Sequence, residues 1–311
     1  MRITLILKGN ITRRSHFEKS LESLRNALPT AAIPLLETRR EGQAVELARR
    51  ACHDSDYLLI AGGDGTINEV LNGCLRAQQH EPQLQLPTLG ILAYGSANDL
   101  CRSLGLRGDV AECVQLLRNR SSALIDAGII RFQTPEGEDA ERFFLNAAGL
   151  GLGARSVQHL GRRPRLLGSN LHYLRSILTT LATYRPQPIR VRSDRGMHWE
   201  GDCLALAAAN GRFVGSGLCI APGARLDDGQ LAITLVGEAD SADLLRNLGH
   251  LRRGELLNHP AAHYDHAAQI EVEHLAAPVP VEADGEFLGQ TPVSISIIPS
   301  AISILHPGLG A

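Results

Sequence analysis

The first third of the chain alternates short apolar runs with stretches whose apolar residues recur at helical spacing. Apolar runs such as RITLIL and YLLIAG have the length and continuity of buried strands. Between them, apolar residues three or four positions apart predict amphipathic helices. The expected strands are 2–7, 31–38, 57–62 and 87–94, and the expected helices are 15–28, 42–53, 66–78 and 108–119. This alternation predicts an α/β domain that is doubly wound, with a largely parallel sheet.

The pattern changes near residue 125, where strands begin to dominate. Turn sequences such as PEGE, SDRG and LDDGQ separate the apolar runs. The expected strands are 124–132, 142–150, 188–194, 203–210, 230–238, 267–274, 279–287 and 293–305. They predict a mostly antiparallel β-sandwich or barrel, interrupted by one helical pattern near 168–184.

The composition is that of an ordinary globular protein. The 311 residues, 44% of them hydrophobic, are enough to bury two cores, and the net charge of −2 creates no field that would recruit nucleic acid. The six cysteines include no CxxC pair, which argues against a zinc site and a disulfide framework. No apolar run approaches the roughly 18 residues of a membrane span, and the N-terminal run is too short for a signal peptide. We therefore expect a soluble cytoplasmic protein, with peripheral contact at the inner membrane surface left open.

The sequence GGDGT, at 62–66, falls between an expected strand and an expected helix. Ligands bind at the carboxyl ends of parallel strands in open α/β sheets. Glycines let backbone N–H groups approach an anion closely, and a helix N-terminus adds the positive end of its dipole. The corner therefore predicts a phosphate site, although a merely tight turn would use the same residues. The motif GxxxxGK[ST] does not occur, which excludes a P-loop NTPase.

Six segments together resemble the diacylglycerol kinase catalytic-domain family, which includes bacterial lipid kinases and sphingosine and ceramide kinases. They are ETRREGQAVELARRA, LLIAGGDGTINEVLNG, LGILAYGSANDLCRSLGL, FLNAAGLGLGA, APGARLDDGQLAITLV and VEADGEFLGQTPVSISIIPSAISIL. The GGDG core alone also occurs in NAD kinases, so the combination carries the resemblance. It implies a nucleotide-binding α/β domain over 1–125, joined by the C-terminal segment 297–311, and a β-sandwich lipid-substrate domain over 126–296, with the nucleotide between them.

By this resemblance the chain is an ATP- and Mg2+-dependent lipid kinase. Such an enzyme transfers the γ-phosphate to a lipid hydroxyl, most simply that of diacylglycerol, which gives phosphatidic acid. Its partners would be ATP and a membrane-derived lipid but not nucleic acid, and a homodimer is compatible with the sequence. Two alternatives stay open, namely an NAD kinase-like enzyme with a soluble substrate and a non-catalytic relative that binds nucleotide or lipid.

The residues that the resemblance assigns to the nucleotide lie at the glycine corner and in the segments beside it. They are Thr38, Gly62, Gly63, Asp64, Gly65, Thr66, Ser96 and Asn98. Asp64 is an anion, so it would act through Mg2+ or organise the loop by hydrogen bonding, and Glu69 would face either the site or solvent. Ser96 stands where the family usually has threonine, and it keeps the hydroxyl. Without the resemblance, Thr38 would be an ordinary strand-end threonine, and Asp64 and Asn98 would be turn or cap residues.

The sequence ADGE, at 283–286, is the candidate for the chemistry. A lipid hydroxyl is a poor nucleophile, and a carboxylate within hydrogen-bond reach can take its proton as the new bond forms. The resemblance assigns this role to Asp284, with Glu286 nearby for metal binding or orientation. Asp-Gly is also the strongest short signal for a hairpin turn, and the two interpretations are compatible.

A second acidic turn, LDDG at 226–229, resembles the block that supplies a structural magnesium site in bacterial members. Asp228 is the first candidate ligand and Asp227 the second, with backbone oxygen from Gln230 completing the shell, because hard cations prefer oxygen ligands. Three histidines, His259, His263 and His266, lack regular metal-ligand spacing and are expected in a polar loop.

Two further segments carry predictions. The first loop has Lys8, Gly9 and Asn10 where the family usually has asparagine-proline and then glycine, which leaves nucleotide affinity open. Further along, an arginine-rich stretch surrounds leucines that share one helical face, and it is either an interfacial element beside the lipid entrance or, as we favour, a helix packed on the sandwich. Those leucines are Leu171, Leu174, Leu178 and Leu181.

Overall fold

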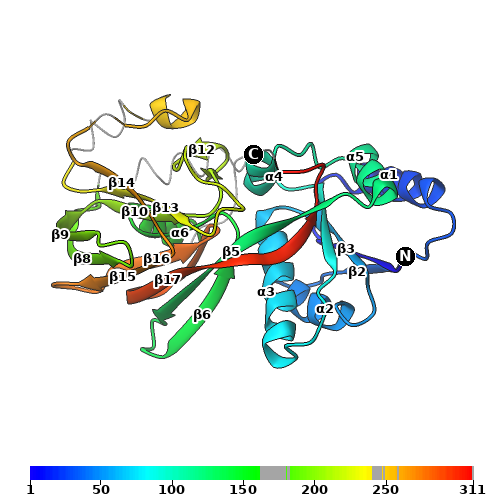
Figure 1. The fold of residues 1–311 in the computed structure, drawn as a ribbon, viewed down its shortest axis with the longest axis horizontal. Helices are drawn as coiled ribbons and strands as arrows, with labels where there is room; N and C mark the ends of the chain where they lie inside the picture. Colours follow the sequence, from blue (N-terminus) through cyan, green and yellow to red (C-terminus); the bar gives the residue numbers. More distant parts are fainter. Residues whose placement is uncertain (162–179, 181–182, 240–246, 248, 258, 310–311) are drawn as a thin grey trace. The chain divides into compact units, whose positions relative to one another are not determined.

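The computed structural model describes residues 1–161, 180, 183–239, 247, 249–257 and 259–309 (Figure 1). The chain forms two compact units. The first is Met1–Ile125 together with the segment that begins at Ser300, and the second is Asp126–Pro299.

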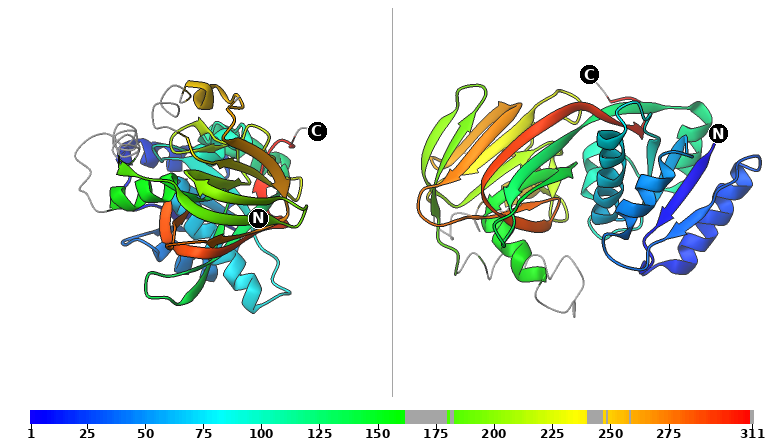
Figure 2. Two further views of the ribbon diagram at one scale, coloured as in Figure 1. Left: turned by 90° about the vertical axis from the view of Figure 1, so that its left-hand side faces the viewer. Right: turned by 90° about the horizontal axis from the view of Figure 1, so that it is seen from below.

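The first unit is built on a parallel sheet in the order β4-β3-β1-β2, to which the end of β17 adds beside β4. The strands are β1 (Ile3–Leu7), β2 (Leu35–Glu37), β3 (Tyr57–Gly62), β4 (Thr88–Ala93) and β17 (Glu286–Leu305). The helices are α1 (Arg14–Ala27), α2 (Gln43–Ala51), α3 (Asp64–His80), α4 (Asp99–Leu104) and α5 (Val110–Asn119). The pair α1 and α5 and the pair α2 and α3 cover opposite faces of the sheet, as Figures 1 and 2 show.

This arrangement follows from the continuous apolar strands, because a strand such as β3 is buried on both faces. The expected strand 31–38 shortens to β2, since Pro34 has no N–H and contributes only its carbonyl oxygen, which accepts from Leu5. The α/β part of the predicted fold class is confirmed.

The second unit is a sandwich of two arrays of strands that share β17. One array has the order β14-β13-β10-β7-β16-β17, and the other includes β9-β8-β15-β17 and the pair β5-β6. The strands are β5 (Ser122–Gln133), β6 (Asp139–Phe144), β7 (Ala147–Gly151), β8 (Gln187–Ser193), β9 (His198–Cys203), β10 (Ala205–Ala209), β13 (Leu231–Val236), β14 (Ala262–Ala267), β15 (Gln269–His274) and β16 (Pro280–Ala283). A short hairpin, β11 (Phe213–Val214) with β12 (Leu218–Cys219), and helix α6 (Leu152–Gly161) complete the described part.

The core of the second unit lies between the two arrays, where alternate residues of both meet. Leu206 and Ile233 come from one array, and Val191 and Ile270 come from the other. The neighbouring strands within this unit pair antiparallel, as in β7 with β10 and β8 with β15. The predicted antiparallel sandwich is confirmed. No helix in the described ranges is long and apolar enough to cross a membrane.

The structure corrects two expectations for this unit, and a third concerns residues that it does not describe. The expected strand 142–150 is two strands, because the chain changes partners after Phe144: β6 pairs with β5, and β7 pairs with β10 and β16. The predicted polar loop at the histidines is wrong, since His263 and His266 lie in β14, an edge strand whose outward positions tolerate polar residues. The leucine face that includes Leu171, Leu174, Leu178 and Leu181 lies outside the described residues.

The packing of α2 on α3 depends on Gly73. A Cβ atom at this position would lie 2.5 Å from the carbonyl oxygen of Val45 and 2.8 Å from the Cβ of Ala48. We expect Gly73→Ala to lower the free energy of unfolding by roughly 1–3 kcal/mol, because α2 must move away from α3. Thermal and urea denaturation would measure this loss. Gly153→Ala is the matched control, since an added methyl there contacts nothing, and equal destabilisation by both substitutions would contradict the explanation.

Candidate functional site

Two loops leave the carboxyl ends of neighbouring parallel strands in the first unit. The glycine loop, Gly62–Thr66, connects β3 to α3, and the second loop, Tyr94–Asn98, connects β4 to α4. The N–H of Tyr94 donates to the carbonyl oxygen of Gly62 at 2.9 Å. A Cβ atom on Gly63 would lie 2.8 Å from the Cα of Gly95, so glycine is needed where the backbones meet. The two loops therefore meet along one edge of the sheet, where their backbones touch.

Side chains of the predicted nucleotide site hold these loops in shape. Asp64 Oδ1 accepts from the N–H of Leu100 at 3.0 Å, which ties the glycine loop to the first turn of α4. Asn98 has a left-handed backbone with φ of 53°, and its amide group accepts from the N–H of Gly95 and donates to the carbonyl oxygen of Gly95, both at 3.1 Å. Thr66 is buried and Ser96 is exposed. Asp64 thus organises the loop by hydrogen bonding, one of the two roles expected for it.

Thr38 connects the first loop of the chain to the same edge of the sheet. Its N–H donates to the carbonyl oxygen of Leu7 at 2.9 Å, and its Oγ1 accepts from the N–H of Gly9 at 3.1 Å. The N–H of Lys8 donates to the carbonyl oxygen of Ala61 at 3.0 Å. The predicted nucleotide residues of the first unit are therefore brought together at the carboxyl ends of β1, β2, β3 and β4.

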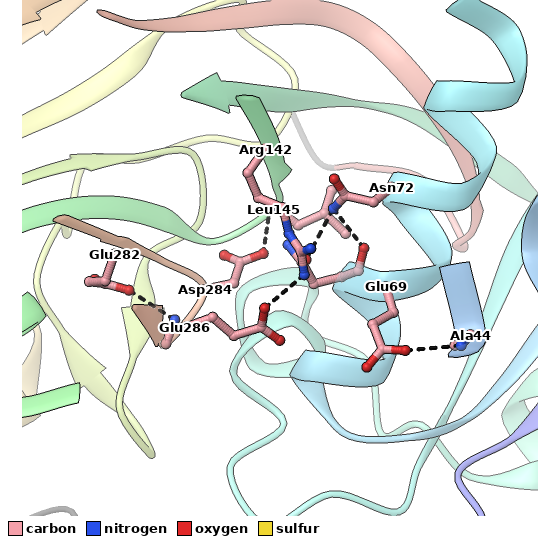
Figure 3. A network of polar contacts seen from close by, with 10 residues as sticks. Ala44, Glu69, Asn72, Arg142, Leu145, Glu282, Asp284 and Glu286 are labelled. Atoms are coloured by element: carbon pink, nitrogen blue, oxygen red, sulfur yellow. Dashed lines mark hydrogen bonds and ion pairs between the residues drawn. The ribbon is translucent and has the colours of Figure 1, made fainter. Parts of the chain in front are cut away.

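Glu69 has a structural role in the first unit. Its Oε2 accepts from the N–H of Ala44 at 3.0 Å, in the first turn of α2 (Figure 3). A carboxylate at this position satisfies a backbone donor that has no partner within the helix. Glu69 therefore links α3 to α2.

The sequence ADGE forms a two-residue hairpin between β16 and β17, which we call the acidic turn (Ala283–Glu286). Asp284 and Gly285 have φ of 47° and 79°, the left-handed values that such a turn requires at both central positions. The hairpin interpretation of Asp-Gly is confirmed. The strained position of Asp284, which is not glycine, is tolerated because its carboxylate is held on both oxygens.

The Asp284 carboxylate accepts hydrogen bonds from three consecutive backbone N–H groups in the connection between β6 and β7. The donors are Leu145 at 2.9 Å (Figure 3), Asn146 at 2.8 Å and Ala147 at 3.2 Å. The side chain of Asn210 holds the same connection from its carbonyl side, because Nδ2 donates to Leu145 at 2.9 Å. The acidic turn is therefore fastened to a backbone segment that is itself fixed.

Glu286 pairs with a residue that the sequence did not single out. Its Oε2 lies 2.7 Å from Nη2 of Arg142, and the two side chains are 34% and 19% exposed (Figure 3). A half-buried pair of this kind has fixed geometry, unlike most surface ion pairs. The only sequence signal was an arginine two residues before the FLNAAG segment.

Glu282 is the third carboxyl of this hairpin and was also missed. Its Oε2 accepts from the N–H of Gly285 at 2.9 Å (Figure 3), and Gly149 is its cross-strand neighbour. The residue as a whole is only half-buried, yet burial of the carboxyl raises the pKa of Glu282 to about 8. The charge of Asp284 acts in the same direction, and the N–H of Gly285 opposes it. The sequence signal was an acidic residue inside an expected strand.

In the candidate metal block, Asp228 lies near a buried carboxylate, Asp126, that the sequence did not single out. Asp228 Oδ1 accepts from the N–H of Gln230 at 3.0 Å, whereas Asp227 pairs with Arg225 at 3.2 Å. The buried Asp126 accepts from the N–H of Gly229 at 2.7 Å. Burial raises the pKa of Asp228, and the nearby charge of Asp126 adds to the effect. Within the described ranges no group of three or more histidine, cysteine, aspartate or glutamate side chains could hold a metal ion.

Comparison with known families identifies both units. Residues 8–130 match the model described as the diacylglycerol kinase catalytic domain, and residues 147–306 match the one described as the YegS C-terminal NAD kinase beta sandwich-like domain. The diacylglycerol kinase of Staphylococcus carnosus (strain TM300) is 27% identical over 272 residues, which covers 87% of this chain and 83% of that protein. The diacylglycerol kinase of Bacillus subtilis (strain 168) is 29% identical over 254 residues, which covers 81% and 78%.

Two solved structures share the fold. A diacylglycerol kinase from Bacillus anthracis str. Sterne superposes with a TM-score of 0.71 at 21% identity, covering 98% of this chain and 96% of that one. Yeast NADH kinase in complex with NADH superposes with a TM-score of 0.56 at 12% identity, covering 98% and 82%. At 21% and 12% identity, these two likenesses show a shared fold and nothing further.

The buried carboxyl of Glu282 should make stability depend on pH. The folded pKa of about 8 lies above the ordinary value of 4.5, so the wild-type protein loses stability as pH rises between these values and is level above them. We expect Glu282→Gln to remove this loss, so that the variant is more stable than wild type near pH 8 by on the order of 2 kcal/mol, with little difference near pH 4.5. Denaturant unfolding across this range measures it, and a constant difference would contradict the assignment.

Proposed function

Because this chain belongs to the diacylglycerol kinase catalytic-domain family and is a lipid kinase, we propose that it transfers the γ-phosphate of ATP to the hydroxyl of diacylglycerol and forms phosphatidic acid. The observation that carries this proposal is the close approach of Gly63 to Gly95, which leaves two backbone loops open to a ligand at the edge of a parallel sheet. Relatives named diacylglycerol kinase that align over most of their length support it.

The triphosphate is assigned to the glycine loop and the second loop. The N-terminus of α3 begins at Asp64 with no side-chain cap, so its first backbone N–H groups are available to an anion. Thr38, Ser96 and Asn98 flank this position, and Lys8 adds a positive charge in the first loop. In this proposal the first unit is the nucleotide-binding domain, and the second unit is the lipid-substrate domain.

The acidic turn supplies the acceptor chemistry. Asp284 is assigned as the group that takes the proton of the lipid hydroxyl, and Glu286 is held in place beside it by Arg142. The bonds from Leu145, Asn146 and Ala147 fix the position of the carboxylate, as proton transfer requires. When bound, Mg2+ supplies positive charge to the transferring phosphoryl group. The acceptor is a membrane-derived lipid, so the enzyme works in peripheral contact with a membrane.

Turnover with a defined acceptor tests this assignment. The protein is incubated with labelled ATP and Mg2+ in three separate reactions, which contain diacylglycerol, a total lipid extract or NAD as the acceptor. Labelled phosphatidic acid is expected with diacylglycerol. Asp284→Asn should lower kcat by about 100-fold to 10,000-fold. It should still fold and bind ATP, because an amide oxygen can keep the two bonds that Oδ1 accepts from Asn146 and Ala147.

The matched control is Asp139→Asn, an exposed aspartate of β6 that should leave turnover unchanged. Full activity of the Asp284→Asn variant would remove the proton-transfer role from Asp284. Labelling of NAD instead of lipid would replace the lipid kinase by a soluble-substrate kinase.

The block around Asp228 fits a divalent cation. Asp126 and Asp228 are like charges near one another with raised basicity at Asp228, a situation that a cation relieves. The residues assigned to hold Mg2+ are Asp228 and backbone oxygen from Gln230, with Asp126 behind them. Asp227, engaged by Arg225, is the weaker candidate ligand.

Removing the metal should destabilise the second unit. We expect Mg2+ at a hundredfold excess over its Kd to stabilise the wild-type protein by about 2.7 kcal/mol relative to protein in EDTA. Asp228→Asn should remove most of this gain, whereas Asp227→Asn should keep it. Thermal denaturation with and without Mg2+ measures the gain. Equal losses in the two variants would contradict the choice of Asp228 as the main ligand.

A further inference from the structure

The acidic turn and the strand residue before it, Glu282, carry three carboxyl groups within residues 282–286, and the donors that they accept from differ. Asp284 accepts from three backbone N–H groups and Glu286 pairs with Arg142. Glu282 accepts a single bond, from Gly285. The proposed function uses Asp284 and Glu286 but gives Glu282 no task.

The carboxyl of Glu282 lies in a niche that the neighbouring strand leaves for it. Strand alternation places Glu282 on the face opposite Val281 and Ala283, which are buried in the core. In register with Glu282 lies Gly149 on β7, and a Cβ atom there would be 3.0 Å from Oε1 of Glu282. Any larger residue would push the carboxyl out. The carboxyl is therefore fitted between Gly149 and the backbone of the turn.

The charged groups around this niche do not neutralise an ionised Glu282. On its own hairpin the neighbours are Asp284 and Glu286, both acidic. β7 presents Gly149, and α6, which packs on β16, carries Arg155 and His159. Arg155 donates to Gln158, and His159 bonds Thr180. Within the described ranges no lysine, arginine or histidine contributes to the pKa of Glu282.

We propose that Glu282, in its neutral form, is a positioning residue for phosphoryl transfer: it holds Gly285, and through it the Asp284 carboxylate, in the working geometry, and its ionisation releases the turn. This inference rests on the proposed function of the acidic turn. A neutral carboxyl accepts from Gly285 through its carbonyl oxygen and fits the niche beside Gly149. An ionised one places a second negative charge beside Asp284 in a poorly hydrated position, and it gains by leaving for water.

The consequence is an alkaline limit on activity. Burial keeps the pKa of Glu282 at about 8, so the proton is retained at neutral pH and lost in mild alkali. When Glu282 leaves the niche, the bond to Gly285 is lost. Asp284 is the next residue of the same turn, so its bonds to Leu145, Asn146 and Ala147 loosen with it. ATP is assigned to the glycine loop and the second loop, which do not include the acidic turn. We therefore expect kcat to fall while KM for ATP stays constant.

The pH dependence of turnover tests this role. Wild-type kcat with diacylglycerol should fall to about one tenth between pH 7 and pH 9. Glu282→Gln, which keeps the neutral shape and an oxygen for Gly285, should retain wild-type kcat at pH 7 and lose this alkaline fall. Glu136→Gln, an exposed glutamate in the turn before β6, should show the wild-type profile. An unchanged profile in Glu282→Gln would overturn the proposal. Loss of activity at pH 7 in a variant that still folds would overturn it too, because the proposed role needs only a neutral oxygen acceptor at this position.

A second measurement does not depend on turnover. Hydrogen exchange of the Leu145, Asn146 and Ala147 amides reports whether Asp284 still accepts from them. Protection factors in the wild-type protein should fall about tenfold between pH 7 and pH 9, and they should stay constant in Glu282→Gln. If no lipid is phosphorylated, the proposed function fails, but the hydrogen-exchange measurement still tests the role of Glu282. Protection factors that stay constant between pH 7 and pH 9 in the wild-type protein would overturn that role even in an active kinase. If the Glu282→Gln variant does not fold, the wild-type series alone decides.

Discussion

The second unit depends on one interaction, the acceptance of three consecutive backbone N–H groups by the carboxylate of Asp284. The chain changes strand partners between β6 and β7, and at such a point the backbone donors have no ladder to satisfy them. Asp284 satisfies them from the neighbouring hairpin, and Asn210 satisfies the carbonyl oxygen of Leu145. A connection that would otherwise be irregular and mobile thus becomes a rigid support. The same interaction positions the carboxylate that the proposed chemistry needs, so stability and function rest on the same atoms.

The first unit solves a comparable problem without a side chain. A ligand with several negative charges needs many donors, and backbone N–H groups at strand ends supply them only if nothing covers them. Gly63 and Gly95 allow the two loops to approach until their backbones touch. Asp64 holds the start of α4 through the N–H of Leu100, and Asn98 holds the second loop through both backbone groups of Gly95. Two residues of the motifs therefore support the loops on which the proposed nucleotide site is built.

Much of this could be predicted from the sequence, because local signals dominate in the relevant segments. The continuous apolar run of β3 and the Asp-Gly pair of the acidic turn each determine their structure over a few residues. Arg142, Glu282 and Asp126 could not be predicted, because their importance comes from the register between strands distant in sequence. Arg142 meets Glu286 only after β6 and β17 take their places in the sandwich, and no spacing in the sequence encodes that distance. His263 was misjudged for a related reason, since an edge strand accepts polar residues that a central strand would reject.

The three carboxyls of Glu282, Asp284 and Glu286 show how one chemical group acquires three behaviours within five residues. Asp284 accepts hydrogen bonds from backbone N–H groups, and Glu286 accepts one from the guanidinium of Arg142. Glu282 lies in surroundings whose burial raises the pKa of its carboxyl. Placing three anions in one hairpin would be costly, because like charges at short range repel strongly where water is scarce. Keeping one of them neutral lowers that cost and leaves the other two charged in fixed positions. In the proposed role, the proton on Glu282 lowers the repulsion between Glu282 and the carboxylate of Asp284 within this hairpin.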